Sequence, residues 1–491
     1  MMLLILNRFT KKELFNFEYF IKSPYFNTND KIIKLFYYLK KGYPYLDIGY
    51  ISRANISLHV YSEIIVNDIK VRKLISQFYK LIKEFLLYDT LRKNVAANEI
   101  ISIKNLEGTE LENMLPEMFT GLEDQFSKTF LKNKHYYYNL INFEREDYLM
   151  KVKEELKVDK YQIKSCYKNI DYQYMILKLE CYYDSLTLNA DLSKVPEMIT
   201  GINAVLNYIA SRKEFFIKHH PLIYFKYLGV MLKSTMDDRY EQELLNCFKK
   251  DLMKYDEDFS FSYYSFLENF YYKKTGEQGD FYKRKLIGVF DDIYIKGLYV
   301  KSNSRRTPKM HSRNYFRVVQ MAYSLKDYEW AEKFIRRSKS GLYPVNAREV
   351  YNLSLARLHF EKKDFRKSYS YLNKVVYKDN YCFIHSKFLF TRICFETGDY
   401  SGAENTVNNL QKYLRRNKDL SPFERAHLKK FLYYIPQLLK VYKAEGEDKD
   451  YLAYILKKNL DDDKDHIASK NWYYEKLGQL TVDSWQLIID S

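Results

Sequence analysis

An aspartate followed by an aromatic residue recurs at nearly constant spacing in the last third of the chain. In each copy a small residue stands three positions after the aromatic one: Asp327, Tyr328 and Ala331; Asp364, Phe365 and Ser368; Asp399, Tyr400 and Ala403. The aspartates are 37 and then 35 residues apart. Self-similarity at this period indicates stacked helix–turn–helix units, which bury their apolar faces only against neighbours of the same kind.

Each part of this pattern has its own physical role. The aspartate caps the second helix of the unit by accepting a hydrogen bond from a free backbone N–H. The small residue lets the second helix approach the first, and the aromatic residue fills the wedge between neighbouring pairs. A period of about 34 residues with this turn is the tetratricopeptide signature. A looser copy at Gly279, Asp280 and Phe281 indicates that the array extends upstream.

Length and composition extend the helical interpretation to the whole chain. At 491 residues it exceeds one ordinary globular core, and 46% hydrophobic with 29% charged residues is a folded composition. With only 15 glycines and 9 prolines, long helices joined by short loops are favoured. We predict an all-α, helical-repeat (tetratricopeptide-like) solenoid of antiparallel helix pairs. The expected parts are a basic N-terminal helical domain (1–100), an array of long helix pairs (101–300), and tetratricopeptide-like repeats with C-terminal capping helices (301–491).

Local signals place several of these helices. Thr10 and Glu13 form a capping box at the start of one helix, and apolar residues at three–four spacing predict another from about 68 to 91. We expect one helix over 125–156 and another over 195–216, with a break at Pro221.

Several segments resemble a functionally uncharacterised bacterial family of large helical-repeat proteins. The similar segments cover most of the chain in order: "FIKSPYFNTNDKIIKLFYYLKK", "EWAEKFI", "YNLSLARLHFEKKDFRKSYSYLNKV", "LRRNKDLS" and "NWYYEKLG". The resemblance implies an all-helical fold with tetratricopeptide-like repeats and supplies no catalytic residues. The chain departs from a standard repeat at Ser368, where alanine is usual, and in an overlong link before "DKDYLAYILKKNL".

The cysteines and the first residues indicate where the protein works. The five cysteines are scattered and include no CxxC pair, which fits a reducing compartment better than a disulfide framework. The apolar run in "MMLLILNRFTKK" is too short for a signal peptide, and no stretch approaches the roughly 20 apolar residues that span a bilayer. We therefore expect a cytoplasmic protein without membrane contact.

The first helices of a tetratricopeptide array line a concave groove, which makes their side chains candidates for binding a partner. The residues at these positions are Arg313, Phe316, Gln320, Arg357, Phe360, Phe388, Arg392 and Phe395. Arginines flanked by aromatic residues suit an acidic or carboxylate-bearing peptide, because a guanidinium pairs with a carboxylate in bidentate fashion. The alternative is structural: the arginines are solvated or pair with Glu361 and Glu396, and the phenylalanines pack between units.

Two basic features suit a second kind of partner. The formal net charge is +17, which favours acidic partners, including nucleic acid. One feature is a stretch over 296–326 without any acidic residue, and the other is the helix expected over 68–91. Residues that would contact phosphate or an acidic partner are Lys301, Arg305, Arg306 and Lys309 in the first, and Lys70, Lys73 and Lys80 in the second. Both features also fit an ordinary solvated surface.

No motif indicates catalysis. The chain has no GxGxxG, phosphate loop, HExxH or nucleophile elbow, so we expect neither catalytic residues nor a cofactor or metal. The preferred function is a non-enzymatic scaffold that binds another protein, with an acidic segment in the groove. The alternative is a nucleic-acid-associated regulator that uses one of the basic features. The sequence does not indicate an oligomeric state.

Overall fold

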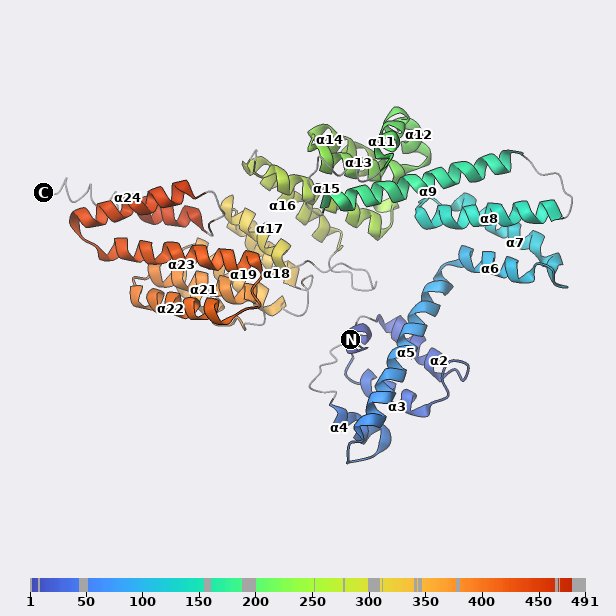
Figure 1. Ribbon diagram of the computed structural model, residues 1–491, viewed down its shortest axis with the longest axis horizontal. Helices are drawn as coiled ribbons and strands as arrows, with labels where there is room; N and C mark the ends of the chain where they lie inside the picture. The colour runs from blue at the N-terminus through green and yellow to red at the C-terminus, as the bar shows by residue number, and fades with distance from the viewer. Residues whose placement is uncertain are drawn as a thin grey trace. The chain divides into compact units, whose positions relative to one another are not determined.

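The computed structural model is all-α across the residues that it describes (Figure 1). These are residues 2–7, 9–43, 52–153, 160–187, 200–250, 252–276, 279–298, 310, 312–339, 342, 347–376, 380–463, 467 and 469–478. Consecutive helices pack on one another along the chain, as expected of a helical repeat. Within these ranges β structure is limited to one parallel bridge, between Met310 and Leu342. None of the described helices is long and apolar enough to cross a membrane.

The described residues divide into two compact units. The first takes those up to Tyr282 and the second those from Lys283 onward, so α16 (Gly279–Ile295) begins in one and continues in the other. The division into three domains stays a prediction.

The first unit begins with helices around a phenylalanine-rich core. They are α1 (Met2–Leu6), α2 (Lys11–Lys22), α3 (Asp30–Lys40), α4 (Arg53–Ile56), the π-helical η1 (Ser57–Tyr61) and α5 (Asp68–Lys93). Phe17 is fully buried, and its ring contacts those of Phe36, Phe78 and Phe85. The apolar face of α5 that the sequence predicts therefore packs onto α2 and α3.

The predicted capping box at the start of α2 is confirmed. The Thr10 hydroxyl accepts a hydrogen bond from the Glu13 N–H at 3.1 Å, and the Glu13 carboxylate accepts one from the Thr10 N–H at 2.9 Å. Pro221 opens a helix as expected, because a proline at the first helical position gives up an N–H that has no partner in the helix.

The rest of the first unit consists of helices of very different lengths, of which α9, with 28 residues, is the longest. They are α6 (Val95–Leu106), η2 (Glu112–Met114), α7 (Leu115–Lys128), α8 (Lys134–Lys153), α9 (Lys160–Thr187), α11 (Ile202–Ser211), α12 (Lys213–His219), α13 (Pro221–Thr235), α14 (Asp238–Phe248), η3 (Leu252–Lys254) and α15 (Glu257–Lys274). In this part α8 packs along α9, and α13 contacts both α9 and α15.

The single helix expected over 125–156 is wrong, because two helices meet there. α7 ends at Lys128 and α8 begins at Lys134. Asn133 stops the first helix from running into the second: its side-chain oxygen accepts hydrogen bonds from the N–H groups of His135 and Tyr136 at 3.0 and 2.9 Å. An asparagine that caps a helix start in this way competes with helix continuation.

The helix expected over 195–216 is also divided. Residues 195–199 lie outside the described residues. Beyond them α11 ends at Ser211 and α12 begins at Lys213, because the Arg212 backbone (φ −124°, ψ 34°) leaves the helical region.

The second unit is a run of helix pairs that follows α16. The pairs are α17 (Ser312–Ser324) with α18 (Tyr328–Ser338), α19 (Ala347–Glu361) with α20 (Phe365–Leu372), α21 (Asn380–Glu396) with α22 (Tyr400–Arg416), and α23 (Pro422–Lys443) with α24 (Gly446–Asp462). Residues 470–478 form a last helical segment, the C-terminal helix. The first helices α17, α19, α21 and α23 contact one another in this order and form the first-helix layer. Each second helix also contacts the first helix of the next pair.

The turn chemistry inferred from the repeat is confirmed in three pairs. The capping aspartates accept hydrogen bonds from backbone N–H groups three residues later: Asp327 from Trp330 at 3.1 Å, Asp364 from Lys367 at 3.1 Å, and Asp399 from Gly402 at 2.9 Å. The small residues that follow, Ala331, Ser368 and Ala403, are all fully buried at 0% exposure. The repeated string is therefore part of the scaffold.

The overlong link after the third pair contains another helix. α23 begins at a second capping box, in which Ser421 and Glu424 bond each other's backbone N–H, and Pro422 occupies the first helical position. The turn into α24 has Gly446 at φ 59° where the earlier turns have the aspartate–aromatic pair. A fourth pair with a different turn explains why the repeat was not detected there.

Candidate partner-binding surface

The structure places the residues predicted for the groove on three first helices. Phe316 and Gln320 belong to α17, Arg357 and Phe360 to α19, and Phe388, Arg392 and Phe395 to α21. Gln320 is exposed. Arg313 lies on the first turn of α17, but its side chain is outside what the structure describes.

The four phenylalanines pack between successive helices. None of them is more than 7% exposed. Phe388 stacks on Phe431 of α23 with ring centroids 3.8 Å apart, and Phe395 meets Tyr442 of α23 at 4.6 Å. These phenylalanines therefore stabilise the first-helix layer and are not accessible to a partner. Of the aromatic and basic residues predicted for the groove, we consider Arg357 and Arg392 next.

Arg392 is a buried guanidinium set between two aromatic rings. Arg392 is only 7% exposed. Its guanidinium carbon lies 4.2 Å from the centroid of the Phe360 ring and 5.2 Å from the centroid of the Trp472 ring. Nη1 donates to the Ser469 hydroxyl at 3.1 Å, and the buried Nε has no hydrogen-bond partner. Burial lowers the pKa of Arg392 to about 10, so it remains cationic at neutral pH.

Glu396, one turn after Arg392, does not neutralise it. One Glu396 oxygen accepts from the Trp472 indole N–H and the other from the Lys476 ammonium, both at 2.6 Å. The C-terminal helix therefore takes both oxygens of Glu396. The charge of Glu361 on α19 also acts on Arg392 and, like that of Glu396, raises its pKa against the effect of burial. Sequence reasoning missed Ser469, Trp472 and Lys476, because these contacts join residues 76 to 80 positions apart.

Arg357 extends the same cationic cluster onto α19. It is partly exposed, its Nε is buried without a hydrogen-bond partner, and its guanidinium carbon lies 6.0 Å from the Tyr323 ring centroid. The positive charge of Arg357 lowers the pKa of Arg392. Burial, together with the charge of Arg357, lowers the pKa of His385 to about 3. The charge of the cluster therefore comes from the two arginines and not from histidine.

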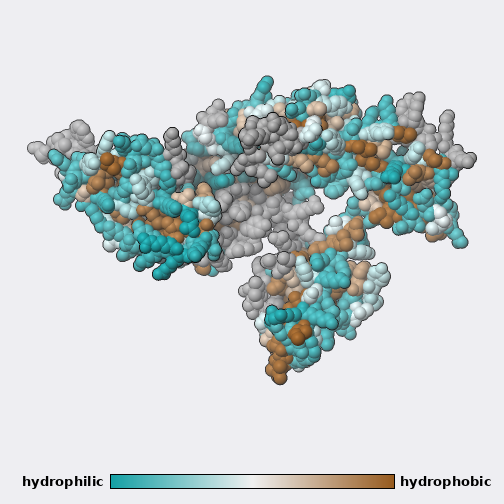
Figure 2. Space-filling model, viewed as in Figure 1, coloured by the Kyte–Doolittle hydropathy of each residue, from teal (hydrophilic) through white to brown (hydrophobic). Residues whose placement is uncertain are grey.

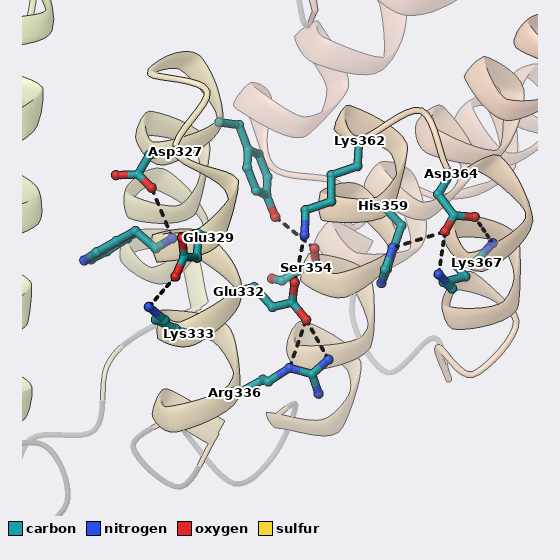
Figure 3. A network of polar contacts seen from close by, with 12 residues as sticks. Asp327, Glu329, Glu332, Lys333, Arg336, Ser354, His359, Lys362, Asp364 and Lys367 are labelled. Carbon is teal, nitrogen blue, oxygen red and sulfur yellow. Dashed lines mark hydrogen bonds and ion pairs between the residues drawn. The ribbon is translucent and has the colours of Figure 1, made fainter.

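The charged side chains on α18 and around the α19–α20 turn are different, because they form ion pairs with one another (Figure 3). The Glu332 carboxylate on α18 accepts from Arg336 and from Lys362, both at 2.8 Å, which lowers its pKa to about 2. Asp364 pairs with Lys367 at 2.9 Å. Among the described carboxylates, none forms such a pair with Arg357 or Arg392.

The basic residues predicted on α5 are exposed, and two of the three already have acidic neighbours. Lys70 pairs with Glu63 at 3.4 Å and Lys80 with Glu84 at 3.7 Å, while Lys73 lies between them on the helix surface. Lys301, Arg305, Arg306 and Lys309, predicted in the other basic feature, lie outside the described residues.

An apolar end adjoins the lysines of α5. Ile64 and Ile65 in the preceding loop are 88% and 86% exposed, and Ile69 in the first turn is 81% exposed. Figure 2 shows apolar surface at this end of α5. Exposed isoleucines beside partly paired lysines suit a phosphate backbone poorly, because phosphate contacts come from cationic and polar groups.

Comparisons of the chain with protein-family models, with curated proteins and with solved structures find no match. Among the described residues, no group of three or more histidine, cysteine, aspartate or glutamate side chains is arranged to hold a metal ion.

Proposed function

We propose that the helix pairs of the second unit are tetratricopeptide-like repeats and that the chain is a non-enzymatic scaffold. In this proposal the first-helix layer binds an acidic segment of another protein through Arg357 and Arg392. Helical-repeat arrays suit such work because they present a large preformed surface. The aspartate-capped turns and the contacts between successive first helices support the repeat assignment.

The observation that carries the proposal is a buried arginine that makes no ion pair with any described carboxylate. Burying a charge is unfavourable unless the charge is paired and hydrogen-bonded. Arg392 is only 7% exposed, its Nε has no hydrogen-bond partner, and the Glu396 carboxylate is taken by Trp472 and Lys476, which leaves Glu361 and Glu396 to act on Arg392 only through their charge. A carboxylate supplied by a partner beside the partly exposed Arg357 would offset the charge of this cluster.

The rings around Arg392 favour binding over a merely structural role. Phe360 and Trp472 hold the guanidinium plane in place, so little side-chain entropy remains to be lost when an anion binds. Arg357, one helix away and partly exposed, offers a second cation to the same segment. Two cations on adjacent repeats suit an acidic stretch of several residues better than a single carboxylate.

Affinity capture from a cell extract tests the proposal. The full chain carrying Arg357→Gln and Arg392→Gln should retain its specific partners at least about tenfold less than the wild type, since each lost charged hydrogen bond is worth roughly 1.5–3 kcal/mol. The matched control carries Arg366→Gln and Arg415→Gln, which remove two exposed arginines from the second helices α20 and α22.

The single variant Arg357→Gln keeps the test valid if loss of the buried Arg392 weakens folding. Circular dichroism melts show which variants are folded. Equal recovery of the same proteins by the wild type, by Arg357→Gln, and by the folded double variant would overturn the proposal. Partners that are retained but carry no acidic segment would overturn its acidic part alone.

A further inference from the structure

The longest described helix of the first unit carries an apolar stripe that stays exposed in the part of the unit that the structure describes. Along α9 the exposed fractions are 44% for Ile163, 68% for Tyr167, 45% for Ile170, 45% for Tyr174 and 43% for Leu177. The spacing alternates between four and three residues, and Cys181, also exposed, continues it. Figure 2 shows apolar surface where Figure 1 places α8 and α9.

The core of the unit uses a different face of α9. Ile176 and Leu179 are fully buried at 0% exposure, and Tyr182 is 5% exposed. The Glu180 carboxylate ties this face to α8 through Lys134 and to α13 through Lys226, each at 2.8 Å. The exposed stripe therefore does not contribute to the core of the unit. Single exposed apolar side chains are normal on protein surfaces, but a continuous row of them indicates an interaction site.

The spacing of the stripe residues indicates the secondary structure of a partner that could cover them. The spacing averages 3.5 residues from Ile163 to Leu177 and 3.6 as far as Cys181, so these side chains lie along one face of α9, where a second helix laid against it would meet them all. From Ile163 to Cys181 the stripe is about 27 Å long at 1.5 Å per residue, enough for a partner helix of about five turns. An extended peptide has a period of two and would not follow it.

The charged residues beside the stripe indicate which charges a partner helix would carry. Lys164, Asp171 and Lys178 each follow a stripe residue directly, at positions that flank a helix–helix seam. Lys164 is exposed, Lys178 is partly exposed and also donates to the Thr200 carbonyl at 2.7 Å, and Lys168 is exposed farther round the helix. Over the full stripe, 163–181, three lysines stand against Asp171 and Glu180, and the Glu180 carboxylate is already paired with Lys134 and Lys226. A second copy of the chain would bring an equally basic helix, so like charges would oppose self-association.

We propose that the α9 stripe is a docking surface for an acidic amphipathic helix of another protein. The partner helix has apolar residues at alternating three- and four-residue spacing, with acidic residues opposite Lys164 and Lys178 and a basic residue opposite Asp171. This surface belongs to the first unit and is independent of Arg357 and Arg392, so it adds a second binding mode to the proposed scaffold.

Two synthetic 21-residue helical peptides test the proposal against the full chain. Both have leucine and isoleucine at the seam; one has flanks ordered glutamate, lysine, glutamate, and the other has these charges exchanged. Fluorescence anisotropy at low salt should show the first peptide binding about tenfold more tightly than the second. Ile170→Asp should abolish binding of both, because it places a charge in the seam.

The flanking charge has a matched control on the same helix. Lys164→Glu should reduce or reverse the preference between the peptides, while Lys168→Glu, which removes the same charge farther from the seam, should leave it. Circular dichroism of each variant confirms folding. No binding by either peptide to the folded wild type would overturn the proposal, and equal binding by both would overturn its acidic specificity. Sedimentation that reveals a dimer abolished by Ile170→Asp would assign the stripe to self-association instead.

Discussion

Trp472 donates its indole N–H to a Glu396 oxygen at 2.6 Å, although 76 residues separate the two in sequence. Lys476, one helical turn further along, donates to the other oxygen at the same distance. Trp472 and Lys476 are each only 5% exposed. These bonds fix the C-terminal helix on α21, where it also supplies one of the rings beside Arg392.

Removing the Glu396 charge should therefore destabilise the second unit. Glu396→Gln keeps the shape of the side chain but leaves the buried Lys476 ammonium without its carboxylate, and we expect a loss of about 3 kcal/mol in the free energy of unfolding. Urea denaturation followed by circular dichroism measures it. Glu404→Gln is the control, because its pair with Lys443 is half exposed and should contribute less than about 1 kcal/mol. Similar losses in both variants would contradict this reading.

The capping aspartates should each stabilise their own repeat. Asp399→Ala removes the acceptor of the Gly402 N–H and should lower the free energy of unfolding by about 1 kcal/mol, whereas Asp399→Asn keeps an acceptor and should lose less. Thermal melts of the two variants compare them. A melting temperature that is equally low in both would show that the charge, and not the cap, matters.

The repeat was predictable because its signals are local. An aspartate three residues before the N–H that it caps, and a small residue one turn into the helix, are determined within a few positions. Even Ser368, unusual at its position, follows the rule: it is fully buried and donates its hydroxyl to the Ala356 carbonyl at 2.6 Å. A serine satisfied in this way is as compatible with close helix packing as alanine.

The surroundings of the two arginines were not predictable in the same way. The sequence places Arg357 and Arg392 on first helices, but the ring of Trp472 and the hydroxyl of Ser469 come from a segment 77 or more residues later. Such contacts depend on where the C-terminal helix docks, which no local period determines. The α7–α8 break was missed for the opposite reason, since Asn133 acts as a cap within an otherwise continuous helical pattern.

Acid should weaken the first unit through a buried histidine. His220 Nδ1 is hydrogen-bonded with the Tyr137 hydroxyl at 2.6 Å, and burial, aided by repulsion from Lys132, lowers the pKa of His220 to about 3. The unfolded chain, with an ordinary histidine pKa near 6.5, therefore binds more protons than the fold between these values. Stability should be full above about pH 6.5 and fall below it by up to about 1.4 kcal/mol per pH unit from this group.

Urea denaturation at pH 7.5, 6 and 5 measures that slope. His220→Gln should make the decline shallower, even if it lowers stability at pH 7.5 by disturbing the contact with Tyr137. His135→Gln is the control, because His135 is exposed and should leave the wild-type slope unchanged. An identical slope in all three proteins would assign the acid sensitivity to other groups.

Two helical glycines should respond to alanine in opposite directions. Gly229 lies on α13 where α15 packs closest, and an added Cβ would overlap the Phe266 ring. Gly229→Ala should therefore destabilise the first unit by about 1–3 kcal/mol through overpacking. Gly121, exposed on α7 of the same unit with open space around it, should gain roughly 0.5–1 kcal/mol on the same change, since alanine loses less backbone entropy in a helix.

The source of the Gly229 effect can be separated from helix propensity. Phe266→Leu alone should destabilise the unit, because it removes ring contacts with Phe225 and Tyr183. In the double variant the smaller leucine leaves room for the new methyl group. The double variant should therefore lose less free energy of unfolding than the sum of the losses in the two single variants. Urea midpoints of the four proteins complete this cycle. Strict additivity, or a stabilising Gly229→Ala, would mean that α13 and α15 are not held as closely as the Gly229 contact with Phe266 requires.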